Sequence, residues 1–260
     1  MIGMNIGMFC RQVARITAAP LFAITIIGFA VEAKSQDAGP MDEKALQVLQ
    51  GMSDYLTTAK TISFRAHTFF DEVQKSGIKI KVARKVRVLI KRPNQLRAVS
   101  ISDDRAVRSA WFDGSKFTVS LAHANQYMEL DFKGNTDALL DELIEKYEAQ
   151  LPLADLLYSN VGQTFKESII SAQYLGVRLV KGVNSHHLSF ESTGADWQIW
   201  IQADASPVPR RFAITYVNRP EKPEFLAALD KWSINGTADD SQFSASVPDG
   251  AKRIKFEKQK

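Results

Sequence analysis

The sequence predicts an α+β protein built on one large, curved antiparallel sheet of about ten or eleven strands, an open half-barrel with a few helices covering its concave face. Three observations favour this class. Segments with alternating apolar and polar residues fill most of the chain, and Gly, Pro and Asp-Gly turn signals separate them. Helical periodicity extends over only two long stretches. An open sheet of this size curls, which leaves one face for the helices to cover.

The N-terminal segment resembles a secretory signal peptide. Arg11 and Arg15 give it a positive start, an apolar run covers 16–31, and small residues precede a cut after Ala33. The alternative is an uncleaved membrane anchor, but this run is shorter than the roughly 20 residues of a spanning helix. We therefore expect a Sec-type signal peptide and a periplasmic protein. Cys10 is the only cysteine and leaves with the signal, so the mature chain has no disulfide or cysteine-ligated zinc.

The expected organisation has three parts. Residues 1–33 are the signal peptide, 34–41 form a polar linker, and 42–260 form a single domain. No internal repeat and no composition shift divides the last part.

The mature chain opens with a helix and a long hairpin. Apolar spacing predicts a helix over 41–59, which Asp42 can cap. Strands follow over 61–74 and 78–91, joined by a turn at 75–77.

The strand over 78–91 has two clearly different faces. Its even positions are apolar, and only Arg84 interrupts them. Its odd positions carry basic residues, among them Lys79, Lys81, Lys85 and Arg87. This alternation predicts a half-buried strand with one wet face. A basic face of this kind usually discourages aggregation at strand edges. It can also contact a membrane surface that bears anionic lipid headgroups, which we keep as a partner hypothesis.

More strands and one further long helix follow. Strands are predicted over 95–101, over 109–121 with a hairpin turn at Asp113-Gly114, and over 126–132. An apolar stripe predicts a helix over 135–150, capped by Asn135 or Thr136, and Pro152 opens a second, short helix. The remaining strands are predicted over 172–181, 185–191, 196–203, 209–217, 226–234 and 251–256.

Two adjacent histidines, His186 and His187, are the most conspicuous candidate site. Adjacent strand residues point to opposite faces, so the pair cannot easily bind one metal ion. We expect His186 to be a structural residue and expect no metal site.

Other chemistry finds no support in the sequence. The chain has no Gly-x-Ser-x-Gly elbow, phosphate loop or dinucleotide fingerprint. The net charge of +4 is mild for a nucleic-acid-binding protein. We therefore expect no catalytic residues, no cofactor, no nucleic-acid partner and no enzymatic activity.

Several segments resemble a bacterial family of predicted periplasmic proteins of unknown function. They are "VRVLIKRPNQLRAVS" (86–100), "WFDGSKFTV" (111–119), "SHHLSFESTGADWQIWI" (185–201), "PVPRRFAITY" (207–216), "DKWSI" (230–234) and "DSQFSASVPDGAKRI" (240–254). The first also resembles the front strands of lipoprotein carriers with the fold of LolA, LolB and LppX. This resemblance implies an open antiparallel half-barrel closed by helices, which holds acyl chains or other lipid in its hollow.

Two functions remain open at this point. The first is a periplasmic protein that binds a lipid, a lipoprotein acyl chain or another hydrophobic ligand in the hollow. The alternative is a non-enzymatic accessory or scaffold protein that binds a protein partner. An apolar cavity of several hundred cubic ångströms would favour the first. The candidate ligand-binding residues form an apolar row on the later strands, expected to face inward under the helix 135–150: Trp197, Ile199, Phe212, Ile214 and Trp232.

Overall fold

The computed structural model describes residues 39–149, 151, 153–166 and 168–256. The predicted signal peptide, with Cys10 and the cut after Ala33, lies outside these residues, as does most of the predicted linker. The end of that linker is described: Ala172 donates a backbone hydrogen bond of 3.0 Å to the Pro40 carbonyl.

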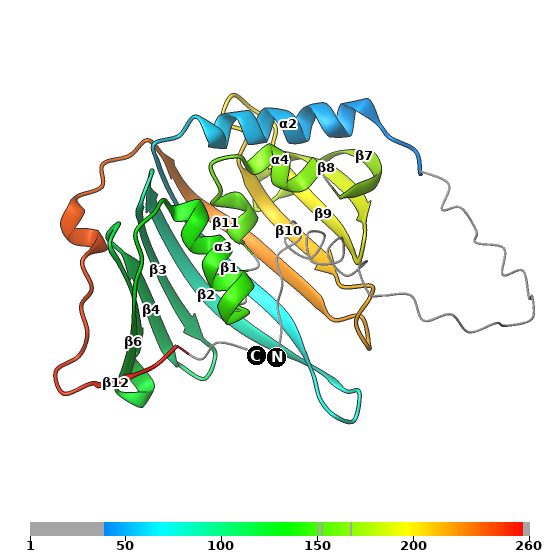
Figure 1. The fold of residues 1–260 in the computed structure, drawn as a ribbon. Helices are drawn as coiled ribbons and strands as arrows, with labels where there is room; N and C mark the ends of the chain where they lie inside the picture. The colour runs from blue at the N-terminus through cyan, green and yellow to red at the C-terminus, as the bar shows by residue number, and fades with distance from the viewer. Residues whose placement is uncertain (1–38, 150, 152, 167, 257–260) are drawn as a thin grey trace, which may run out of the picture.

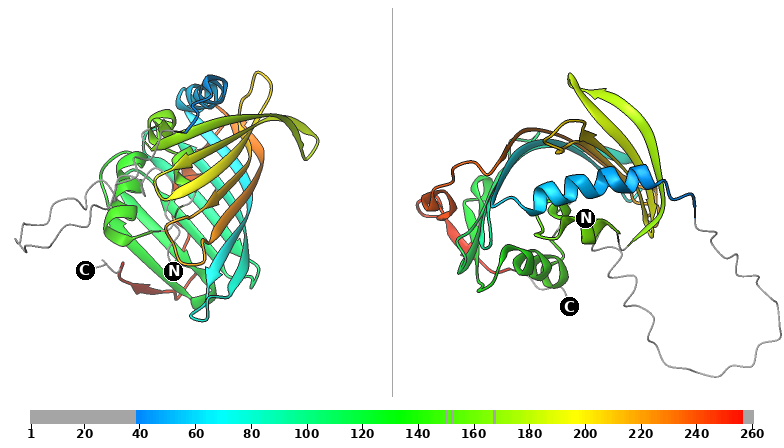
Figure 2. Two further views of the ribbon diagram at one scale, coloured as in Figure 1. Left: turned by 90° about the vertical axis from the view of Figure 1, so that its right-hand side faces the viewer. Right: turned by 90° about the horizontal axis from the view of Figure 1, so that it is seen from above.

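All strands of the described chain belong to one twelve-stranded sheet, in the order β12-β6-β5-β4-β3-β2-β1-β11-β10-β9-β8-β7. The sheet curves into an open half-barrel around the helices (Figure 2). This confirms the α+β class and the open antiparallel sheet. One pairing is parallel, that of the short β12 with β6.

The first half of the sheet is a meander of six strands. They are β1 (Thr61–Val73), β2 (Lys79–Lys91), β3 (Gln95–Ser102), β4 (Val107–Phe112), β5 (Lys116–Leu121) and β6 (Gln126–Asp131). The predicted hairpin of β1 and β2 is confirmed, with continuous register from Thr61↔Lys91 to Val73↔Lys79. The predicted turn between β4 and β5 also forms. Gly114 takes a φ of 96°, and Asp113 accepts hydrogen bonds from two backbone N–H groups.

The second half of the sheet is another meander. It contains β7 (Ile169–Val180), β8 (Val183–Ser192), β9 (Ala195–Gln202), β10 (Pro209–Thr215) and β11 (Glu224–Ile234). β11 pairs with β1 and joins the two halves into one sheet. After β11 the chain passes through η3 (Asp240–Phe243) to β12 (Lys252–Ile254) at the far edge.

Helices cover the concave face, each over its own part of the sheet (Figure 1). Asp42 caps α2 (Glu43–Thr57) by accepting from the Lys44 N–H, and Asn135 caps α3 (Thr136–Tyr147) by accepting from the Ala138 N–H. After α3, the short helix predicted to open at Pro152 is only the 3-10 turn η2 (Ala154–Leu156). It is followed by α4 (Val161–Lys166), which was not predicted from the sequence. This helical segment carries the chain across the concave face from β6 to β7, at the opposite edge of the sheet.

Candidate functional site

The apolar row predicted to bind ligand lies in a closely packed part of the core. Trp197 stacks on Phe190 with ring centroids 4.1 Å apart and on Phe165 of α4 at 5.1 Å. Its Nε1–H donates a hydrogen bond of 2.9 Å to the Ser192 hydroxyl. Ile199, Phe212 and Ile214 are at most 1% exposed. Trp232 is partly buried, with its ring 4.6 Å from that of Phe64.

The helix over these residues differs from the expected one. α2 and α4 cover the strands β7 to β10, and α3 lies over the other half of the sheet (Figure 1). The five predicted residues are brought together in one core, but none of them lines the cavity that the structure contains. Their role in ligand binding stays a prediction.

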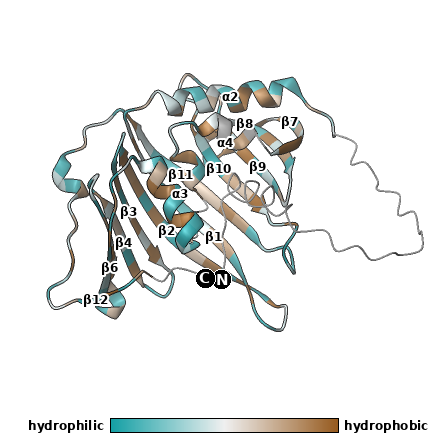
Figure 3. Ribbon diagram, in the orientation of Figure 1, coloured by the Kyte–Doolittle hydropathy of each residue, from teal (hydrophilic) through white to brown (hydrophobic). Residues whose placement is uncertain are grey.

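A cavity of about 560 Å³ lies between α3 and the strands β1 to β6. Ligand sites of about 300–1,000 Å³ are typical of small-molecule binding. Its wall is apolar along the sheet, where Val86, Val88, Leu96, Ala98, Ala110 and Val119 contribute side chains. α3 supplies its apolar stripe from the other side, through Leu139, Leu140, Leu143 and Tyr147. Figure 3 shows apolar stretches on β3, β4 and β6 and a mixture of apolar and polar residues along α3.

Local sequence explains why these side chains face the cavity. Residues that alternate along a strand share one face, so Val86 and Val88 point inward together with Ala98 on β3 and Ala110 on β4. Small residues such as alanine leave space in front of the sheet. The apolar positions of 78–91 were therefore identified from the sequence, but their role as a cavity wall was not.

One end of the cavity is polar. Arg84, Arg108, Glu72 and Ser100 line it there, and Arg108 is exposed. Arg84 is the residue that interrupts the apolar row of its strand, so the sequence carried this signal. No role for Arg84 was predicted from the sequence.

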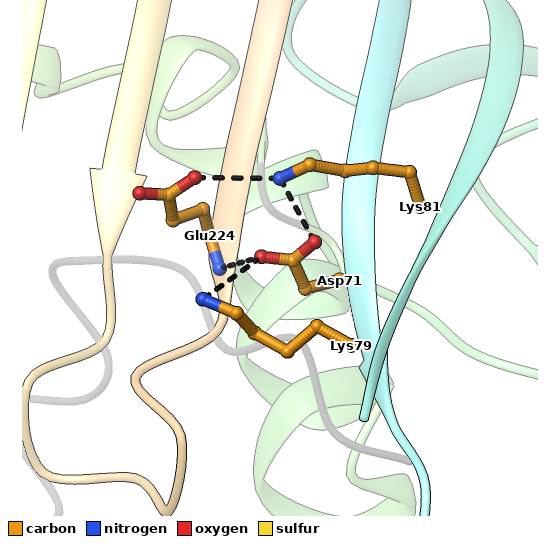
Figure 4. A network of polar contacts seen from close by, with 4 residues as sticks. All are labelled: Asp71, Lys79, Lys81 and Glu224. Carbon is orange, nitrogen blue, oxygen red and sulfur yellow. Dashed lines mark hydrogen bonds and ion pairs between the residues drawn. The ribbon is translucent and has the colours of Figure 1, made fainter. Parts of the chain in front are cut away.

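The four basic residues considered for membrane contact lie on the convex face of β2, away from the cavity. Lys81 Nζ lies 2.8 Å from a carboxylate oxygen of Asp71 and 3.3 Å from one of Glu224, and Lys79 Nζ lies 3.8 Å from Asp71. Figure 4 shows this network, which links β2 to the start of β11 across β1. Lys85 and Arg87 form no ion pair with a described carboxylate, so they are the residues on which the membrane prediction now rests.

The network around Asp71 holds β1, β2 and the start of β11 together. Burial by itself would raise the pKa of Asp71, but the hydrogen bonds from Lys81 and from the Glu224 N–H, with the nearby lysine charges, outweigh burial and lower it. The ionised carboxylate is thus stabilised on the outer side of the sheet, on the face opposite the cavity.

The two histidines have separate partners. His186 Nδ1 lies 2.9 Å from the Tyr174 hydroxyl, and His187 Nε2 lies 2.9 Å from the Gln198 side-chain oxygen. The His187 ring also stacks on Trp200, with centroids 4.1 Å apart. Burial lowers the pKa of both histidines. Within the described part of the chain, no three His, Cys, Asp or Glu residues are grouped so as to hold a metal ion.

The fold and the cavity define a class of protein: an open antiparallel half-barrel whose helices enclose an apolar hollow. The chain belongs to the family described as "Predicted periplasmic protein (DUF2092)", whose model matches residues 45–257. This confirms the family resemblance seen in the sequence, and the family description confirms the periplasmic location. A search of curated proteins found no match. Among the described residues, no helix has the length and apolar character needed to span a membrane.

Several solved structures are similar to this chain. Lipoprotein LppX of Mycobacterium tuberculosis has a TM-score of 0.44 and 14% identity, over 76% of this chain and 98% of LppX. LprF of Mycobacterium bovis has a TM-score of 0.44 and 12% identity, over 82% of this chain and all of LprF (100%). A chain in the MucA/MucB complex of Pseudomonas aeruginosa has a TM-score of 0.40 and 12% identity, over 78% of this chain and 61% of that one.

Proposed function

We propose that this periplasmic protein binds a lipid or another molecule with an acyl chain in the cavity between α3 and the strands β1 to β6. The observation that carries the proposal is the cavity itself. Its volume of about 560 Å³ and its apolar wall match what a flexible hydrocarbon chain requires. Burial of apolar ligand surface supplies about 25 cal/mol per Å², so a chain enclosed here gains binding free energy along its whole length.

The cover of the cavity also suits a binding role. α3 contacts the sheet mainly through its apolar stripe, and it ends at Glu148, which takes a φ of 47°. The opposite half of the molecule has a tightly packed aromatic core instead. A scaffold protein that only presents its outer surface has no need for this difference. We therefore favour ligand binding over the scaffold alternative.

The experiment compares two neighbouring substitutions on β3. Ala98 faces the cavity and Val99 faces the convex side, so Ala98→Trp should fill the cavity while Val99→Trp leaves it open. The delipidated proteins are titrated with the uncharged fluorescent probe N-phenyl-1-naphthylamine. We expect wild type and Val99→Trp to bind the probe and Ala98→Trp to lose binding, with all three folded by circular dichroism. Equal binding by both variants, or no binding by wild type, contradicts the proposal.

A further inference from the structure

The charged side chains of the cavity are confined to one end because of the strand register. Arg84 on β2 pairs with Ser102 on β3, while Arg108 on β4 pairs with Ser100. The two arginines therefore lie on strands separated by β3, and their positions differ by two residues along the strand direction. Strand spacing of about 4.8 Å and a rise of about 3.4 Å per residue place their Cα atoms about 12 Å apart. Both side chains lie on the concave face and line the same cavity.

The two arginines differ from the lysines around Asp71 in their surroundings. Among the described residues, neither forms an ion pair within 4.0 Å. Glu72 also lines the cavity, but it lies four residues beyond Thr68, which is the β1 partner of Arg84. Asp104 is not among the residues that line the cavity; a hydrogen bond from Ser102 is the main cause of its lowered pKa, and the charges of His123 and Arg108 contribute. Of the charged residues that line the cavity, two are arginines and one is Glu72, so the lining itself has an excess of positive charge.

Away from the arginines, the cavity wall becomes apolar along the strands. Beyond the pair of Ser100 and Arg108, the next pair on the same face of the sheet is Ala98 with Ala110, and the one after it is Leu96 with Phe112. Leu139 and Leu140 of α3 close this deeper part and are almost fully buried. The hollow is therefore amphipathic, with a cationic mouth and an apolar depth.

We propose that the ligand of this cavity is an amphiphile with an anionic head, a carboxylate or a phosphate, held between Arg84 and Arg108 with its acyl chain directed towards Leu96 and α3. This inference rests on the proposed function and specifies its ligand class. Guanidinium groups suit both heads, since each offers paired N–H donors to two oxygens of the anion. A neutral lipid would offer neither arginine an anionic group with which to form a charge-assisted hydrogen bond.

The test displaces bound N-phenyl-1-naphthylamine with four amphiphiles: palmitate, palmitoyl lysophosphatidic acid, monopalmitoylglycerol and hexadecyltrimethylammonium. The variants are Arg84→Gln, Arg108→Gln and the double variant. Arg97→Gln is the matched control, because it removes one positive charge from the convex face of β3. Thermal unfolding of each variant shows that it is folded, and exposed Arg108 gives a variant whose folding is not at risk.

We expect the affinity of wild type for the anionic amphiphiles to exceed its affinity for the neutral one by about tenfold or more, as two charge-assisted contacts predict. Each single Gln variant should lose about tenfold for the anionic ligands only, and Arg97→Gln should bind like wild type. Preference for palmitate or for lysophosphatidic acid identifies the head as carboxylate or phosphate. The inference is overturned if the neutral or cationic amphiphile binds equally well, or if the double variant keeps its anionic affinity. In these cases the uncharged probe still binds, so the proposed function survives; failure of the probe itself overturns both.

Discussion

At the residue scale, single side chains explain much of how the strands are held in place. Arg84 and Asp71 both belong to the β1–β2 hairpin, but they point to opposite faces and have different surroundings. Asp71 is 2% exposed and has two lysines and a backbone N–H as partners, so its charge is satisfied. Arg84 lines the cavity with no described acidic partner. Asp71 therefore supports the fold, and Arg84 is the residue to which we assign the anionic head of the proposed ligand.

The first prediction at this scale concerns Asp71→Asn. The pKa of Asp71 is lowered in the folded protein, so ionised Asp71 stabilises the fold above its unfolded pKa of about 3.9. This contribution is lost as the pH falls through the lower, folded pKa. We expect Asp71→Asn to cost about 1 kcal/mol at neutral pH, since the half-exposed lysines weaken the pairing.

Urea unfolding at several pH values measures this contribution. The difference between wild type and Asp71→Asn should shrink on acidification. Asp249→Asn is the control, because Asp249 is exposed and forms no ion pair with a described residue. A difference that stays constant down to strongly acidic pH would contradict the role assigned to the Asp71 charge.

At the element scale, one arginine connects the helices to the sheet. Arg92 follows β2 directly, and its guanidinium donates to the carbonyls of Leu56 at 2.7 Å, Ala59 at 2.8 Å and Tyr158 at 2.7 Å. These carbonyls belong to the C-terminal end of α2 and to the segment before α4. A cation suits the C-terminal end of a helix, where the backbone carbonyls carry partial negative charge. Arg92 thereby connects α2 and the segment before α4 to the end of β2.

We expect Arg92→Met to lower the free energy of unfolding by about 2–3 kcal/mol, because it removes the charged donor from several partly buried carbonyls, among them those of Ala59 and Tyr158. Methionine keeps the apolar part of the side chain, so the loss reports on the hydrogen bonds. Arg97→Met on the convex face should change stability by no more than about 0.5 kcal/mol. Chemical denaturation of both variants provides the comparison, and equal stability of the two would exclude this role for Arg92.

At the scale of the whole molecule, the two halves of the sheet have different interiors. Strands β9 and β10 pack against α4 through aromatic rings, α2 covers β7 to β9, and strands β1 to β6 face a cavity under α3. The same sheet therefore combines a closely packed half with a half that contains a cavity. The chain crosses from one edge to the other on the concave side, so its helical segment contributes to both interiors.

This difference predicts that an aspartate introduced into the packed half destabilises the protein more than one introduced into the cavity wall. Ile199 is 0% exposed in the packed half, so Ile199→Asp should unfold the protein, because an unpaired buried charge costs several kcal/mol out of about 5–15 in total. Val86 lines the cavity and is only partly buried, so Val86→Asp should leave the protein folded, with water able to reach the charge. Thermal unfolding followed by circular dichroism distinguishes the two, and equal destabilisation would mean that the hollow behaves as ordinary core.

The sequence by itself determined the local structure. Alternation with a period of two defined most strands and the two faces of β2, and Asp42, Asn135 and Asp113-Gly114 marked helix starts and a turn correctly. It also determined the family and the compartment. These features depend on neighbouring residues, whose spacing can be read directly from the chain.

Only the tertiary structure decided where the hollow lies. Alternation shows that Ile199 and Val86 each face inward, but both then look like core residues, and no local pattern tells which helix covers which strands. That depends on the pairing of β1 with β11, residues separated by more than a hundred positions, and on the crossing of the helical segment over the sheet. α3 consequently covers the first meander and not the apolar row of the later strands. Arg84 was visible in the sequence as the one break in an apolar row, but only the folded sheet brings it to the same cavity as Arg108, because strand register is a property of long-range pairing.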